Sequence, residues 1–221
     1  MSLSPAEENY LKALFHLTLE SREEETGTNK VAEYLEVSPA SVNAMVKRLK
    51  VKDLVIYERY GKLRLSEEGK SLAMEMIRKH RLWETFLYRH LNFGWEEIHE
   101  VAEELEHIQS AKLIRELEAF MGYPETDPHG DAIPSADGTY EPAEKLTLRQ
   151  IDEGERCRLV AVKDSSVAFL QYVTRLGLEL SSTIEVIEKR SFDQSMLIRL
   201  IENEKQVNVS AKFAANVYVS R

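Results

Sequence analysis

One stretch of this 221-residue chain concentrates histidine and glutamate: IHEVAEELEHIQSAKLIRELE, from Ile98 to Glu118. Its apolar residues recur every three to four positions, which predicts one continuous helix over the whole stretch. Just upstream, His80 and Glu84 lie one helical turn apart. Imidazole and carboxylate groups at such spacings are ligands that a divalent cation takes, so the pattern predicts a metal site. The same spacing places four further polar side chains on one stripe of the predicted helix: His99, Glu103, Glu106 and His107.

Simpler explanations exist for each of these residues taken singly. A lone buried histidine is usually a hydrogen-bonded core residue, and a run of glutamates is usually a solvated face. Neither explanation accounts for two segments that each place histidine and glutamate at helical spacing. The HEVAE sequence approaches the H-E-x-x-H of zinc proteases, but Glu103 replaces the second histidine, which argues against that enzyme class.

The composition limits the kinds of protein that this chain can be. It holds 38 acidic and 29 basic residues, for a net charge of −9, and 43% of its residues are hydrophobic. No apolar run approaches the ~20 residues that span a bilayer, so we expect no membrane segment. The single cysteine, Cys157, cannot form an internal disulfide, and we expect a reducing cytoplasm.

Four sections can be distinguished along the chain. A helix is predicted from about Ala6 to Glu20, and a proline-free helical region from roughly Glu67 to Met121. A segment rich in Pro, Gly and Asp (GYPETDPHGDAIPSADGTYEPAE) is typical of a linker, and alternating β-branched segments predict a small all-β domain at the end. We therefore expect an α+β protein with a DNA-binding domain at 1–68, a helical metal-binding domain at 69–124, a linker at 125–145 and a small β domain at 146–221.

The DNA-binding prediction depends on the segment TNKVAEYLEVSPASVNAMVKRLKVKDLVIYERYGKLRLSEEG, in which bases outnumber acids. Ser38 is a good N-cap and Pro39 suits the first position of a helix. Two short helices followed by a basic hairpin around Tyr60 and Gly61 predict a winged helix-turn-helix. Its second helix fits the major groove of DNA, although some winged helices serve protein contacts instead. The buried stripe expected for this helix is Val42, Met45, Val46 and Leu49.

The residues expected to face DNA lie on the second helix and on the hairpin. Small side chains at the start of the helix would let the backbone approach the bases, and the basic side chains would meet phosphates. These residues are Ser38, Pro39, Ala40, Ser41, Asn43, Lys47, Arg48, Lys50, Arg59, Lys62 and Arg64.

Several motifs occur in the order found in a known family. EENYLKALFHL, the winged helix-turn-helix, RKHRLWETFL, IHEVAEELEH and PHGDAIP together resemble the DtxR/MntR family of metal-dependent transcriptional repressors. The sequence from Glu153 to Asp193 resembles the SH3-like FeoA domain of its longer members. The resemblance implies a homodimer that binds operator DNA, is not an enzyme, and uses a divalent metal as corepressor in manganese or iron homeostasis.

The resemblance also implies the metal ligands. The family's primary site corresponds to Asn9, Glu103, Glu106 and His107. A second site corresponds to His80, Glu84 and His99, completed by Asp127, His129 and Asp164. Glu103 and Asp127 stand where other members have cysteine. The resulting oxygen and nitrogen ligands favour Mn²⁺ over Fe²⁺, with Zn²⁺, Co²⁺ or Ni²⁺ able to bind in vitro.

Two other functions stay open from the residues alone. The first is a winged-helix regulator that ignores metal and whose acidic helices only dimerise. The second is an enzyme with a carboxylate–histidine metal centre, for which no substrate pocket or general base can be recognised.

Overall fold

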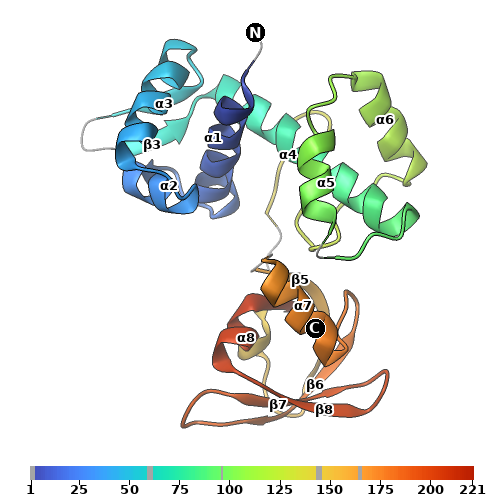
Figure 1. Ribbon diagram of the computed structural model, residues 1–221. Helices are drawn as coiled ribbons and strands as arrows, with labels where there is room; N and C mark the ends of the chain where they lie inside the picture. Colours follow the sequence, from blue (N-terminus) through green and yellow to red (C-terminus); the bar gives the residue numbers. More distant parts are fainter. Residues whose placement is uncertain (1–2, 59–61, 96, 143–145, 164–165) are drawn as a thin grey trace. The chain divides into compact units, whose positions relative to one another are not determined.

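The computed structural model describes residues 3–58, 62–95, 97–142, 146–163 and 166–221 (Figure 1). The chain divides into two compact units. Unit 1 comprises Met1–His80 and Ile133–Pro142, and unit 2 comprises Arg81–Ala132 and Ala143–Arg221. No helix in the described ranges is long and apolar enough to cross a membrane.

Unit 1 contains a three-helix cluster and a small antiparallel sheet with strand order β1-β3-β2. A π-helical turn, His16–Glu20, extends the first helix, so the predicted helix over 6–20 is present with a change of winding. The helices are α1 (Pro5–Phe15), α2 (Thr28–Tyr34) and α3 (Pro39–Val51), and the strands are β1 (Thr26–Gly27), β2 (Val55–Tyr57) and β3 (Lys62–Leu65).

Local sequence explains why the second helix of this cluster starts where it does. Ser38 caps α3, because its Oγ accepts the N–H of Ser41 at 3.1 Å, and Pro39 occupies the first helical position. The four residues expected in the buried stripe of α3 are all buried. The predicted winged helix-turn-helix is therefore present, although its wing tip, with Arg59, Tyr60 and Gly61, lies outside the described residues.

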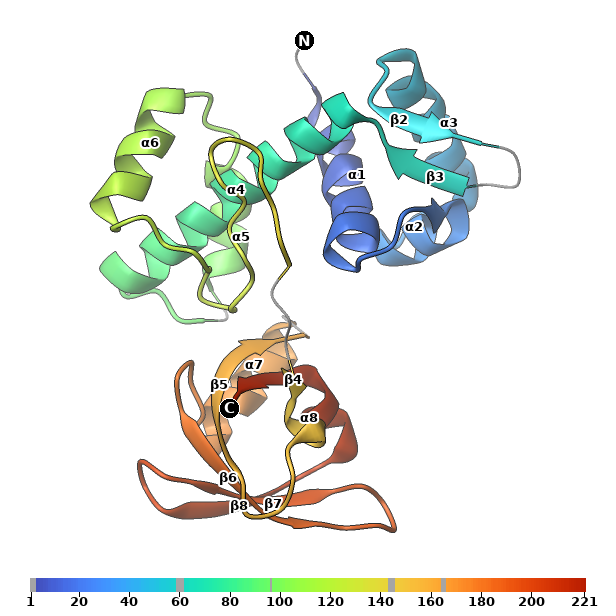
Figure 2. The ribbon, with the colours of Figure 1, turned by 180° about the vertical axis from the view of Figure 1, so that it is seen from behind.

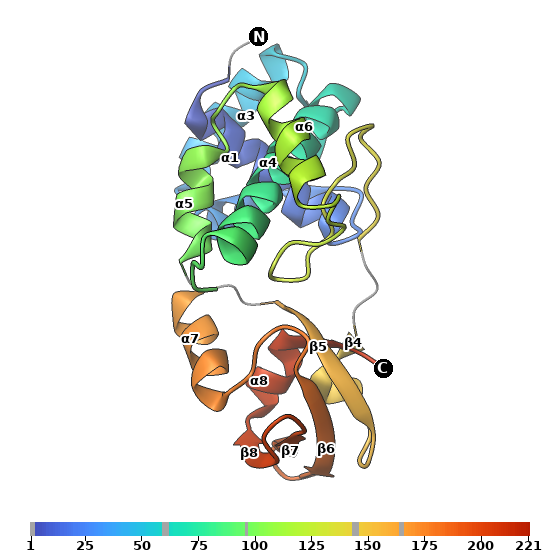
Figure 3. The ribbon, with the colours of Figure 1, turned by 90° about the vertical axis from the view of Figure 1, so that its right-hand side faces the viewer.

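Three helices form the second part of the molecule in sequence order. α4 (Glu67–His90) starts in unit 1 and ends in unit 2, and it is followed by α5 (Ile98–Leu105) and α6 (Ala111–Phe120). The prediction of one helix from Ile98 to Glu118 is wrong, because the chain leaves the helical path between α5 and α6. Ser110 causes the restart, since its Oγ accepts the N–H of Leu113 at 3.3 Å as the N-cap of α6. Aromatic contacts from Phe86 and His90 of α4 to Phe120 hold α6 against α4 (Figure 3).

The C-terminal domain is a six-stranded antiparallel sheet with strand order β4-β9-β5-β6-β7-β8. It also contains two helices, α7 (Val167–Leu176) and α8 (Ala211–Asn216), so the expectation of an all-β domain is wrong. Both helices begin at a serine N-cap, Ser166 and Ser210, within otherwise strand-like sequence. Figure 2 shows α8 beside the edge strand β4. The strands are β4 (Leu146–Thr147), β5 (Arg156–Val162), β6 (Thr183–Lys189), β7 (Met196–Leu200), β8 (Lys205–Val209) and β9 (Val217–Ser220).

Candidate metal centre and DNA-binding surface

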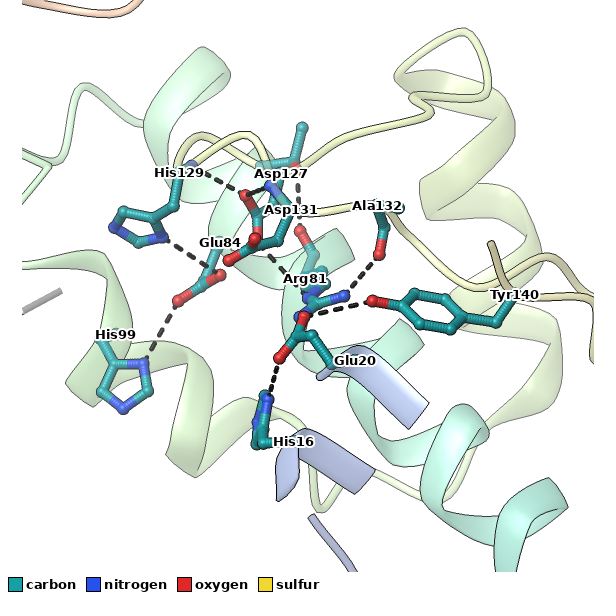
Figure 4. Close-up of polar contacts among 11 residues, drawn as sticks. His16, Glu20, Arg81, Glu84, His99, Asp127, His129, Asp131, Ala132 and Tyr140 are labelled. Carbon is teal, nitrogen blue, oxygen red and sulfur yellow. Dashed lines mark hydrogen bonds and ion pairs between the residues drawn. The ribbon is translucent and has the colours of Figure 1, made fainter. Parts of the chain in front are cut away.

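Glu84 lies at the centre of a buried polar cluster in unit 2 (Figure 4). It projects from α4 and is only 2% exposed. Its Oε1 lies 3.3 Å from Nδ1 of His99 on α5, and its Oε2 lies 3.7 Å from Nδ1 of His129. One carboxylate thus connects two imidazoles that come from distant parts of the sequence.

Asp127 and His129 reach this cluster from a tight loop. Oδ1 of Asp127 accepts the backbone N–H groups of His129 at 2.8 Å and Asp131 at 2.9 Å, which fixes the loop from within. Gly130 has a φ of +78°, and a Cβ there would lie 1.8 Å from the carbonyl oxygen of Val160. Only glycine therefore lets the loop approach β5 this closely.

Glu84, Asp127 and His129 meet the basic requirement for holding an ion. Each offers a ligand atom, these atoms lie within 4.8 Å of one another, and all three residues are buried. Among the described residues, Nε2 of His129 is a buried nitrogen without a hydrogen-bond partner. Two carboxylates and one imidazole fit a divalent cation that prefers oxygen and nitrogen ligands.

The electrostatics of the cluster also favour a bound cation. Burial, together with the charges of Asp131 and Glu84, raises the pKa of Asp127 to about 7, although Arg81 opposes this. Nε of Arg81 lies 3.5 Å from Oδ2 of Asp127. Burial alone would lower the pKa of His129, but its hydrogen bond with Glu84 and the nearby carboxylates together outweigh burial, and the pKa is raised. The raised pKa of His129, against the effect of burial, shows that negative charge is in excess here.

The other predicted ligands lie around this cluster or apart from it. Nε2 of His99 is 3.8 Å from Oε1 of Glu103, one turn further along α5. His80 is buried on α4, one turn before Glu84, at the last residue of unit 1. Asp164 lies outside the described residues.

The predicted primary site is less compact. Glu106 is buried directly after the end of α5, whereas His107 is exposed in the following turn. Within the described part of the chain, Glu103, Glu106 and His107 do not bring three ligand atoms within 4.8 Å of one another. Asn9 is on α1 in unit 1 and is not among the buried residues of that helix.

Three residues of the cluster were not anticipated as part of it. Arg81 pairs with Asp127, Asp131 contributes a second carboxylate to the loop, and Trp95 stacks on His129 with ring centroids 6.0 Å apart. The sequence offered a partial signal, because Arg81 stands between His80 and Glu84 and Asp131 ends the HGD triplet. Trp95, in the turn after α4, carried no such signal in the sequence.

The predicted DNA-facing side of α3 is largely open to solvent. Ser38, Pro39, Ala40, Ser41, Lys47, Arg48 and Lys50 are exposed, while Asn43 is half-buried and accepts a hydrogen bond from the Tyr57 hydroxyl at 3.3 Å. On the wing, Lys62 is paired with Glu25, and Arg64 lies 3.8 Å from Glu58. Unit 1 therefore presents a basic helix face for DNA, together with a wing whose basic side chains are partly neutralised by glutamates.

Family models match nearly the whole chain. Residues 2–63 match the iron dependent repressor N-terminal DNA binding domain, residues 66–135 its metal binding and dimerisation domain, and residues 146–221 the FeoA domain. The structure of the manganese regulator SloR is 32% identical, with a TM-score of 0.75 over 99% of this chain and 100% of that one. The chain belongs to the DtxR/MntR family.

Other members of the family show the range of metals in it. A manganese-dependent transcriptional repressor in complex with manganese has a TM-score of 0.84 at 29% identity, over 96% of this chain and 98% of that one. The iron-dependent repressor IdeR of Mycobacterium tuberculosis is 35% identical over 131 residues, 58% of this chain and 54% of that protein. The chain therefore spans about half the length of the mycobacterial relatives it matches. The family is one of DNA-binding repressors, which argues against the metalloenzyme alternative.

Proposed function

We propose that this chain is a metal-dependent transcriptional repressor that binds operator DNA as a homodimer and uses Mn²⁺ or Fe²⁺ as corepressor. The observation that carries the proposal is the buried group of Glu84, Asp127 and His129 in a chain that also presents an exposed basic helix. Such a regulator acts on the chromosome, so we place it in the cytoplasm.

The ligand types favour a hard cation. We propose that Glu84, Asp127 and His129 hold one ion, with His80, His99 and Asp164 as further ligands or neighbours. Glu103, Glu106 and His107, with Asn9 from α1, are proposed as a second ion site. Neither set contains sulfur, which favours Mn²⁺ over Fe²⁺ and leaves Zn²⁺, Co²⁺ and Ni²⁺ as ions that bind in vitro.

The chain's own residues explain how a metal would matter. Without an ion, the carboxylates of Glu84, Asp127 and Asp131 repel one another in a buried place. A bound divalent cation supplies two positive charges that offset this repulsion. The loop at Asp127 and His129, helix α4 and helix α5 are then held together more tightly, which reduces the motion of the dimerisation domain. Metal and DNA would each strengthen binding of the other, by a coupling of ~1–3 kcal/mol.

The dimer is supported by exposed apolar side chains. Leu91 after α4, and Leu113 and Phe120 on α6, are large hydrophobic residues that are open to solvent in the single chain. A homodimer formed through this surface would carry two α3 helices, and successive major grooves on one side of a duplex lie one DNA turn, about 34 Å, apart.

The decisive experiment measures operator binding by fluorescence anisotropy at fixed salt, with a fragment from the gene's own upstream region. Mn²⁺, Zn²⁺ and anaerobic Fe²⁺ are titrated into metal-free protein. We expect tight binding only with metal, and loss of the metal response in Glu103→Ala/Glu106→Ala with the fold retained. Glu104→Gln, an exposed carboxylate on α5, is the matched control. Binding that ignores metal in the wild-type chain would favour the metal-independent regulator instead.

A further inference from the structure

A single carboxylate in unit 1 connects the start of α1 to the end of α3. Glu7 lies in the first turn of α1 and is only 2% exposed. Its Oε2 accepts the N–H of Ser4 at 2.9 Å and the hydroxyl of Ser4 at 3.0 Å, which completes the cap of α1. Its Oε1 lies 2.7 Å from Nζ of Lys52.

Lys52 is the residue that closes the C-terminus of α3. Its backbone N–H donates to the carbonyls of Arg48, Leu49 and Lys50, so its position follows the last turn of the helix. Nη2 of Arg48 lies 3.9 Å from the same Glu7 oxygen, but the Arg48 side chain is 64% exposed. Glu7 therefore holds Lys52 closely and leaves Arg48 able to turn towards a phosphate.

This ion pair differs from the other pairs of unit 1 in its burial. The Glu67–Lys70 pair has a similar length, 2.8 Å, but its Glu67 side chain is 90% exposed. The Glu7 side chain is 2% exposed and that of Lys52 is 21% exposed, so this partly buried pair is screened less by salt than an exposed pair and resists displacement of one helix relative to the other.

We propose that Glu7 is a positioning residue for DNA recognition, which fixes the pose of α3 to that of α1 through Lys52. The inference rests on the proposed function. Asn9, a proposed metal ligand, follows Glu7 by two residues on the same helix, so a pull on α1 reaches the recognition helix through this pair. Neither Glu7 nor Lys52 belongs to the expected DNA-facing set, and neither is a proposed ligand.

The test uses the full-length chain with Glu7→Gln, Lys52→Met, the double variant and Lys52→Arg. The Glu7→Gln change keeps a side-chain oxygen for the Ser4 cap while removing the charge that holds Lys52. We expect each single variant to lower operator affinity at saturating Mn²⁺ by about 5- to 10-fold, within the usual range of coupling effects. The double variant should lose no more than either single variant, and Lys52→Arg should recover most of the affinity. The exposed-pair control, Glu67→Gln/Lys70→Met, should bind like the wild-type chain.

Two further measurements separate positioning from direct contact and from loss of fold. The Mn²⁺ affinity without DNA should stay within about twofold of wild type, and the slope of log K against log salt should not change, because no phosphate contact is removed. If Lys52→Met reduces this slope by the amount expected for the loss of about one phosphate contact, the proposal is overturned, because Lys52 would then contact DNA itself. Equal operator affinity in Glu7→Gln, or additive losses in the double variant, would also overturn it.

If Glu7→Gln does not fold, the comparison of Lys52→Met with Lys52→Arg still decides. A wild-type chain that ignores metal refutes the proposed function and this role with it, whereas a metal response that is equal in all variants refutes only this role.

Discussion

Replacing Glu84 by Gln tests the buried cluster with little change in shape. The amide keeps one oxygen near His99 and His129 but removes a charge that lies close to the carboxylate of Asp127. Because that charge repels Asp127, the metal-free variant should be as stable as wild type or slightly more so. With metal present the sign reverses, since a charged ligand has been lost.

The size of the metal effect follows from charge and linkage. A unit charge and a divalent ion 4 Å apart interact by about 8 kcal/mol at an effective dielectric constant of 20. The remaining amide oxygen and the removal of the repulsion with Asp127 offset most of this, so we take a loss of ~2.7 kcal/mol, or about 100-fold in Kd. At an ion concentration about 100 times the wild-type Kd, metal stabilises the wild-type chain by ~2.7 kcal/mol and the variant by only ~0.4 kcal/mol. For a chain of this size, that predicts a metal-induced rise in Tm of about 5–11 °C in wild type and about 1–2 °C in Glu84→Gln.

The assay is thermal unfolding with and without Mn²⁺, carried out in the Glu103→Ala/Glu106→Ala background so that the second proposed ion site does not contribute. Glu104→Gln in the same background controls for removal of an acidic charge from a neighbouring helix. A full metal-induced rise in Tm in Glu84→Gln would refute the reasoning, because the cluster would then not be the place where the ion binds.

Three more predictions concern the same unit. Gly130→Ala should destabilise the chain by more than ~2 kcal/mol and weaken metal binding, because its Cβ would meet a carbonyl of β5. The control is Gly122→Ala, where φ is +73° but the space is open, and it should destabilise the chain by only about 1 kcal/mol. Chemical denaturation measures both losses of stability. Asp127→Cys should shift preference from Mn²⁺ towards Zn²⁺ by at least about tenfold in competition titrations, because a thiolate is a softer ligand, and an unchanged ratio would argue against Asp127 as a ligand. Burial raises the pKa of Cys157 to about 11, so its thiol should stay unlabelled by a thiol reagent at a pH of about 8 until the chain unfolds, and fast labelling of the native chain would contradict this.

The winged helix could be predicted from the sequence because its determinants are local. The apolar spacing of α3 and the Ser38–Pro39 start are contained within a few residues, and the structure shows the helix they specify. The break between α5 and α6 was missed because residues 106–109 are compatible with a helix, and neither proline nor glycine interrupts them. The N-cap role of Ser110 was the one local sign of the restart.

The metal cluster could be predicted only in part, and for a different reason. Spacing on one helix paired His80 with Glu84, but the proximity of Glu84, Asp127 and His129 depends on a loop more than 40 residues away in the sequence. The resemblance supplied those positions, while periodicity did not. Arg81 and Trp95 were missed because their contacts with Asp127 and His129 are made through the tertiary fold.

The environment of Asp127 explains how a cation could be added to the buried cluster. Oδ1 is occupied by two backbone N–H groups, so Oδ2 is the oxygen left for an ion, and it already faces Arg81 at 3.5 Å. Arg81 also donates to the carbonyl of Ala132, so its charge is shared between the loop and the carboxylate. Burial, and then the charges of Asp131 and Glu84, raise the pKa of Asp127 despite the nearby guanidinium of Arg81. Arg81 therefore holds the loop in place without metal but does not neutralise all the negative charge of the cluster. A divalent cation can bind here without displacing the arginine.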